Sequence, residues 1–166
     1  CHPDGKNRIA NGKYKGELFS YVVGEHPSFV SSHFKREERF PILIKFIDAM
    51  KKLSIQVHPS DENAIAEDGE EGKAEMWYVV KAKPKAYLYY GLNRQITKEE
   101  LRKKILDGTV CEVLNKVYVH EGDVFFILPG TLHAIGEGMV IAEIQQNSNS
   151  TFRVYDYGRK GADGRE

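Results

Sequence analysis

The chain has 166 residues, 41% of them hydrophobic and 29% charged, which is typical of a globular protein with one core. Its 24 Lys and Arg residues equal its 24 Asp and Glu residues. This balance argues against nucleic-acid binding, so an anionic ligand would have to be held by local charges. No apolar run approaches the roughly 18 residues that span a bilayer, and no signal peptide is recognised. With only two cysteines, we expect no disulfide framework and a cytoplasmic location.

The first 40 residues are predicted to form a loop and a short helix that packs on the domain after it. Residues 1–16 are rich in Gly, Asn and Lys, as loops often are. Within 17–26, apolar pairs recur after four residues, a spacing that favours a short helix. We expect the main domain to span 41–160 and a flexible tail to follow over 161–166.

From Pro41 onward the pattern changes to short β-rich segments separated by charged or Pro-containing turns. The predicted strands lie within 42–48, 52–58, 75–82, 86–92, 122–128, 139–145 and 151–157. Closely spaced strands with little helix predict an all-β fold, a sandwich or small barrel.

One helix is predicted between the fourth and fifth of these strands. Thr97 and Glu100 form a capping box, an apolar stripe follows, and Gly108 ends the helix. The acidic, Gly-containing insert 60–72 is predicted to be a loop. The fold would then be a β domain with a small helical insert.

An amide and an imidazole lie two residues apart at the end of the second predicted strand. Alternation along a strand places Gln56 and His58 on one face, and Pro59 then stops the strand. This pair is a candidate half of a metal site. The alternative is a histidine that only completes a local hydrogen bond.

A carboxylate opens the next predicted strand. Glu75 shares its face with Trp77 and Val79, so it needs a partner if it is buried. Lys73 would share that face and could offset the charge or bind an anion. The alternative is a solvated acid at a strand end.

A third candidate ligand follows a turn and an apolar strand. Gly122 and Asp123 lead into that strand, Pro129 and Gly130 break it, and His133 follows. The alternative is a turn histidine exposed to water. The stretch resembles the second cupin motif, with both glycines and the histidine at the expected spacing and the proline one residue later than in the motif.

The first cupin motif has two histidines and then a glutamate. Here Gln56 stands in place of the first histidine, and Glu75 follows His58 only after the acidic insert. This arrangement resembles that of type I mannose-6-phosphate isomerases. Four segments resemble characteristic segments of that family in the same order: LSIQVHP (53–59), GKAEMWY (72–78), LPGTLHAIG (128–136) and EIQQNSNSTFRVYDYGR (143–159).

The resemblance runs from about residue 2 to residue 159 and implies a cupin barrel or jelly roll. It implies a Zn²⁺ site, which four oxygen and nitrogen ligands suit; the implied ligands are Gln56, His58, Glu75 and His133. It also implies a catalytic role for Arg153, whose alternative is an ordinary surface arginine. The substrate-binding residues that it implies are Lys45, Ser54, Lys73 and Arg159.

The implied reaction interconverts mannose 6-phosphate and fructose 6-phosphate through an enediol-type intermediate, whose charge zinc and Arg153 would stabilise. A small sugar phosphate is the expected partner, and a homo-oligomer is left open. Two His and one carboxylate also describe the facial triad of iron oxygenases, so another metal-dependent cupin is one alternative. A non-catalytic sugar-phosphate-binding cupin is the second. Family members extend beyond both ends of this chain, which leaves open that it is partial.

Overall fold

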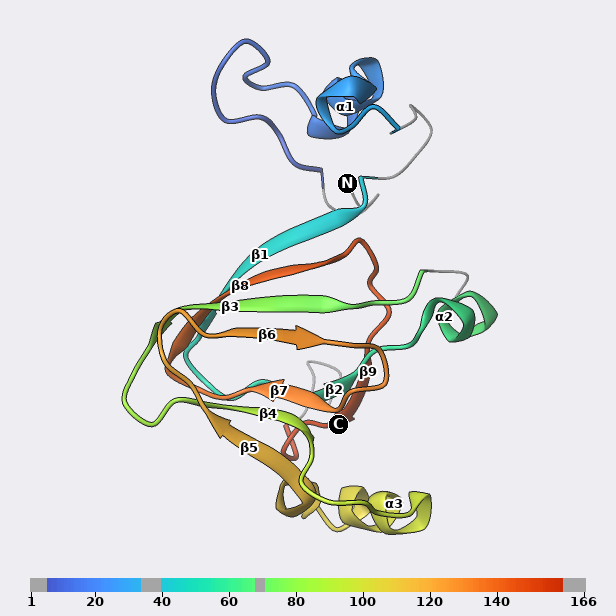
Figure 1. Cartoon of the computed structure of the whole chain (residues 1–166), viewed down its shortest axis with the longest axis vertical. Coiled ribbons are helices and arrows are strands. Elements are labelled where there is room, and N and C mark those ends of the chain that lie inside the picture. The colour runs from blue at the N-terminus through green and yellow to red at the C-terminus, as the bar shows by residue number, and fades with distance from the viewer. Residues whose placement is uncertain (1–5, 34–39, 68–70, 160–166) are drawn as a thin grey trace.

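Two antiparallel β-sheets face each other in the computed structural model, which describes residues 6–33, 40–67 and 71–159 (Figure 1). The four-stranded sheet has the order β1 (Ile42–Ala49), β8 (Met139–Gln146), β3 (Glu75–Ala82) and β6 (Val124–Ile127). The five-stranded sheet has the order β5 (Leu114–Tyr118), β4 (Tyr87–Leu92), β7 (His133–Ile135), β2 (Ile55–Val57) and β9 (Phe152–Tyr155). The predicted all-β fold is confirmed.

The main core lies between the two sheets, because alternate residues of their strands point inward. The buried cluster there includes Trp77 and Val79 from β3, Ile141 from β8, Leu88 from β4 and Ile135 from β7. Toward one end of β3 and β8 the inward residues become polar. This change in the buried residues, from apolar to polar along the same two strands, places a polar pocket at that end of the sandwich.

That polar end is set by the pairing of β3 with β8. Trp77 lies opposite Glu143, and Glu75 lies opposite Gln145. All four side chains are buried. The register therefore brings two carboxylates and an amide to one place on the inner face, beside the last apolar layer of the core.

Three α-helices and two short 3₁₀ helices lie among the described residues: α1 (Phe19–Glu25), η1 (Pro27–Phe29), α2 (Asp61–Glu67), α3 (Lys98–Leu106) and η2 (Val110–Val113). The short helix predicted within 17–26 is confirmed by α1. Leu101 and Ile105 of α3 pack with Val110 and Val113 of η2 in a second apolar cluster, which also holds Ile55 of β2. This cluster covers part of the outer face of the five-stranded sheet.

The outer face of the four-stranded sheet carries apolar side chains that remain exposed. Phe46 of β1 is 76% exposed and Phe126 of β6 is 64% exposed, while Ile44, Tyr78 and Val124 are also exposed. We call these five residues the bare face. They come from three strands of one sheet, so the bare face is a broad feature of the surface.

The loop predicted over 60–72 is wrong for its first half, because Asp61–Glu67 forms α2. Two acidic residues, Asp61 and Glu62, lie in the first turn, where the helix dipole favours negative charge. Ala64 is fully buried and anchors the helix. Residues 68–70 lie outside the described part of the chain, as do 161–166, the predicted tail.

The predicted start of α3 is confirmed, since the Thr97 side chain accepts a hydrogen bond from the Glu100 amide at 3.1 Å. The Glu100 carboxylate pairs with Arg94 instead of completing the reciprocal half of the box. Gly108 has a positive φ of 71°, as expected just past a helix. Among the residues described, no helix is long and apolar enough to cross a membrane.

Candidate metal site and pocket

Three buried side chains from both sheets meet at the polar end of the sandwich. One ligand atom from each of His58, Glu75 and His133 lies within 4.8 Å of the other two. His58 Nε2 is 3.0 Å from Glu75 Oε1, and His133 Nε2 is 3.9 Å from Glu75 Oε2. Glu75 opens β3, His133 opens β7, and His58 follows β2 directly. Residues far apart in the sequence therefore form one candidate metal site.

Gln56, the predicted fourth ligand, lies in a row of three paired residues that crosses the five-stranded sheet. Gln56 of β2 is opposite His133 of β7 on one side and opposite Arg153 of β9 on the other. The Gln56 amide nitrogen donates to Ser54 Oγ at 2.9 Å, which makes its amide oxygen the candidate ligand atom. Its role as a metal ligand stays a prediction.

Two of the candidate ligands are oriented by further hydrogen bonds. His133 Nδ1 is 2.8 Å from the Thr131 carbonyl and donates to it, so Nε2 carries the lone pair that faces Glu75. The Trp77 indole N–H donates to Glu75 Oε2 at 3.0 Å. Partners of this kind fix the rotamer and protonation of metal ligands.

His58 provides the test of whether these residues fit a metal. Both of its ring nitrogens are buried without a hydrogen-bond partner among the described residues. The short distance from Nε2 to Glu75 therefore lacks the alignment of a hydrogen bond. Leaving a polar atom buried and unpaired costs about 1–3 kcal/mol. A cation bound between His58 and Glu75 would satisfy the imidazole, so the residues present fit a divalent metal.

The charges of the site suit metal binding near neutral pH. Burial raises the pKa of Glu75, but His58, His133 and Lys73 outweigh it and bring that pKa down to about 2. Burial is the main reason that the pKa of His133 falls to about 4. The carboxylate is therefore ionised and the His133 imidazole neutral, which are the forms that bind metal.

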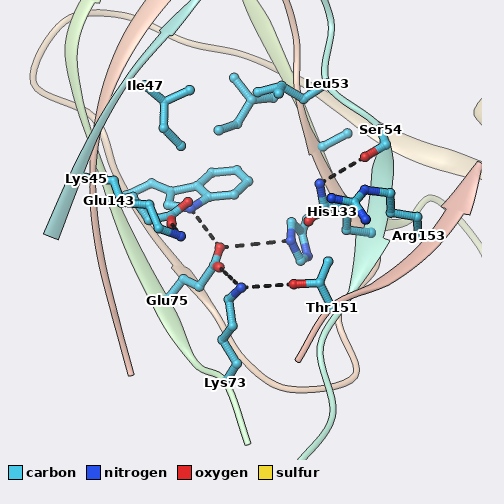
Figure 2. Close-up of a pocket in the computed structure, with 14 residues that line it drawn as sticks. Lys45, Ile47, Leu53, Ser54, Lys73, Glu75, His133, Glu143, Thr151 and Arg153 are labelled. Carbon is cyan, nitrogen blue, oxygen red and sulfur yellow. Dashed lines mark hydrogen bonds and ion pairs between the residues drawn. The ribbon is translucent and has the colours of Figure 1, made fainter. Parts of the chain in front are cut away.

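A pocket of about 230 Å³ opens beside these ligands (Figure 2). Three cationic side chains line it. Lys45 Nζ donates to Glu143 at 2.9 Å and also pairs with Gln145. Lys73 and Arg153 are the other two. The pocket is therefore a place where an anionic group could be held beside the candidate metal site.

The three cations differ in their surroundings. Lys73 is buried, donates to Thr151 at 3.0 Å, and lies 3.6 Å from Glu75, beside the candidate ligands. Burial lowers the pKa of Lys73. Arg153 is exposed at the pocket rim, and Figure 2 shows it on the same side of the pocket as Ser54. A soluble anion entering the pocket would meet Arg153 before Lys73.

Most of the predicted site residues lie in or next to this pocket, which Ser54 also lines. Arg159 is not among its lining residues. It donates to the Lys52 carbonyl at 2.8 Å and pairs with Asp156. Its role in substrate binding stays a prediction, since its side chain is occupied by these contacts.

Sequence reasoning missed two polar residues that line the pocket, Glu143 and Thr151, and a third, Gln145, that contacts the lining residue Lys45. Glu143 and Gln145 both come from β8 and both accept from Lys45. The signal was present in MVIAEIQ, where alternation places both residues on the same face as Met139 and Ile141. An acid and an amide in line with buried apolar residues indicate a buried polar site.

Comparisons with known proteins point to one enzyme family. A family model described as "Phosphomannose isomerase type I, catalytic domain" matches residues 1–71. Mannose-6-phosphate isomerase ManA of Bacillus subtilis (strain 168) is 44% identical over 166 residues, which cover 99% of this chain and 52% of that protein. A crystal structure of the mannose 6-phosphate isomerase from Bacillus subtilis matches with a TM-score of 0.89 at 37% identity, over 99% of this chain and 52% of that one. The chain is thus related to the type I phosphomannose isomerases.

The likeness to the phosphomannose isomerases confirms the predicted cupin fold. A zinc-bound mannose 6-phosphate isomerase also shares this fold, with a TM-score of 0.64 at 15% identity over 98% of this chain and 66% of that one. The chain spans about half the length of the curated phosphomannose isomerases that it matches. The elements β2, β7 and β9 and the first half of β3, which build the site, lie within the four segments that resemble the family.

Proposed function

We propose that this chain forms the zinc-binding pocket of a mannose-6-phosphate isomerase that interconverts mannose 6-phosphate and fructose 6-phosphate. The observation that carries the proposal is the meeting of His58, Glu75 and His133 beside a pocket lined by three cations. Two imidazoles, a carboxylate and the amide oxygen of Gln56 are ligands that suit Zn²⁺ and leave a position open. The relationship to mannose-6-phosphate isomerases supports the choice of reaction.

The reaction moves a proton between C1 and C2 of the open-chain sugar, and negative charge develops on oxygen. Bound zinc would supply a Lewis acid that polarises a sugar oxygen. A guanidinium is a poor base and a good donor of hydrogen bonds, so we assign Arg153 to stabilising the developing charge rather than to removing the proton. Gln56 lies between Arg153 and His133 in the sheet, and Arg153 lines the same pocket as His133, which supports this role.

The sugar phosphate needs cationic partners, and Lys73 is the first candidate. Its buried ammonium already has Glu75 and Thr151 as neighbours, and a phosphate would add charge-assisted hydrogen bonds. Arg159 would contribute only if it exchanged its contact with Asp156 for the substrate. These two residues would make the site prefer a phosphorylated sugar over the neutral one.

The first prediction concerns the metal and the reaction together. The purified chain should bind one equivalent of zinc and then isomerise mannose 6-phosphate, with little turnover of mannose. His58→Ala should lose stoichiometric zinc and the activity, because it removes a buried ligand. Metal analysis and a coupled isomerase assay, with and without added zinc, measure both effects.

Lys116→Ala is a matched control, since Lys116 is an exposed strand residue of β5 outside the pocket lining. It should keep full zinc and activity. Full zinc occupancy in His58→Ala would contradict the ligand assignment. Zinc bound at one per chain with equal turnover of mannose and mannose 6-phosphate would contradict the proposed substrate.

A further inference from the structure

Trp77 contacts two candidate ligands that come from different sheets. It follows Glu75 by two residues on β3, so both side chains point inward from the same strand. Its indole N–H donates to Glu75 Oε2 at 3.0 Å. Its ring also packs edge-on against the His133 imidazole, with centroids 5.4 Å apart and planes at 75°. At 2% exposure, Trp77 has no room to leave this position.

The hydrogen bond from Trp77 settles which oxygen of Glu75 faces which neighbour. Oε2 receives the indole N–H and faces His133, while Oε1 lies 3.0 Å from His58 and 3.6 Å from Lys73. Without the indole donor, the Lys73 ammonium would be the strongest remaining partner in the vicinity. The carboxylate could then turn toward that cation and away from the imidazoles.

We infer that Trp77 is a positioning residue for the metal centre, and this inference rests on the proposed function. Its N–H holds the Glu75 carboxylate in the orientation that binds metal, against the attraction of Lys73. Its ring restrains His133 at the same time. Partners of this kind typically change metal affinity by about 10- to 100-fold when they are removed.

Trp77→Phe tests the inference, because phenylalanine keeps an aromatic ring but has no N–H donor. Zinc affinity, measured by competition with a chromophoric chelator, should fall by about tenfold or more. A zinc dissociation constant within threefold of that of the unsubstituted chain would overturn the inference. Unfolding in urea is measured in parallel, so that loss of packing can be separated from loss of the donor.

Phe125→Leu is the matched control for packing. Phe125 lies opposite Trp77 in the β3–β6 pair and packs against the same core cluster. It should lower stability while leaving zinc affinity within threefold. If Phe125→Leu weakens zinc binding as much as Trp77→Phe does at a similar loss of stability, general packing explains the effect and the inference fails.

A second measurement needs no substitution and covers the case in which Trp77→Phe does not fold. Trp77 is the only tryptophan of the 166 residues, so fluorescence excited at a wavelength that tyrosine does not absorb reports on this one indole. Zinc binding at Glu75 should change the emission and saturate at one equivalent. If zinc binds at one per chain and the emission does not change, the inference about Trp77 fails while the proposed function stands. No zinc binding by the unsubstituted chain would overturn the proposed function as well.

Discussion

Arg153 and the candidate metal ligands should control different properties of the site. Arg153→Ala should lower kcat by about 100-fold or more, the usual loss on removing one preorganised donor that stabilises a transition state. Zinc content should not change, because the arginine is exposed at the pocket rim and is not among the candidate ligands. Steady-state kinetics and metal analysis of the same preparation measure both quantities.

Arg94→Ala is the matched control, since Arg94 is an arginine paired with Glu100 near the start of α3. Its removal should leave kcat within about twofold, as expected for a surface ion pair. Near-normal turnover of Arg153→Ala would rule out the catalytic role. Loss of zinc from that variant would show that Arg153 supports the ligands instead.

At the scale of single residues, the sequence alone could place side chains on a face but not opposite one another. Period-two alternation put Gln56 and His58 on one face, and Glu75 and Trp77 on another. That these faces meet depends on the packing of two sheets, which only the resemblance to a family supplied. Glu143 was overlooked because its strand is apolar at most other inward positions, and its partner Lys45 comes from a distant part of the chain.

Among the elements, α3 depends most on residues close to it in the sequence. Its N-terminal cap can be tested separately from the candidate metal site. Thr97→Ala should lower the free energy of unfolding by about 1 kcal/mol, because the Glu100 amide loses its acceptor. Zinc affinity should stay the same, since neither residue lines the pocket. Urea denaturation followed by far-ultraviolet circular dichroism measures the loss.

Thr97→Ser keeps the hydroxyl acceptor and serves as the control. It should be within about 0.5 kcal/mol of the unsubstituted chain, because serine is at least as good a cap as threonine. Equal stability of the alanine and serine variants would show that the cap contributes nothing measurable.

Element boundaries were predictable where the local pattern was strong and not where tertiary contacts decide. The strand predicted at 75–82 coincides with β3, and α3 begins after its predicted cap. β7 was missed because His133–Ile135 is too short to show a period, and it exists through pairing with β2 and β4. The acidic insert contained a helix because burial of Ala64 stabilises a segment that reads as polar.

At the scale of the whole molecule, the two sheets differ in what lies outside them. The bare face exposes large apolar side chains, and contiguous exposed apolar surface binds apolar molecules. The folded chain should therefore bind an apolar fluorescent dye without denaturant. Replacing Phe46 and Phe126 together by serine should lower that binding several-fold, because these two have the highest exposed fractions of the bare face.

Tyr118→Ser is the control, since Tyr118 is an exposed aromatic residue of the other sheet. It should leave dye binding nearly unchanged. Dye titrations of all three proteins under conditions where circular dichroism confirms the folded state make the comparison. Unaltered dye binding by the double variant would show that the dye binds elsewhere.

The row formed by Gln56 with His133 and Arg153 has a consequence for how such a chain can change in length over evolution. Side chains alternate along β2, so one residue inserted within that strand would turn Gln56 out of the row. The connection that contains α2 is different, because it leaves from His58 and returns at Glu75 while those side chains stay 3.0 Å apart. Insertions and deletions should therefore accumulate between these two candidate ligands rather than within β2.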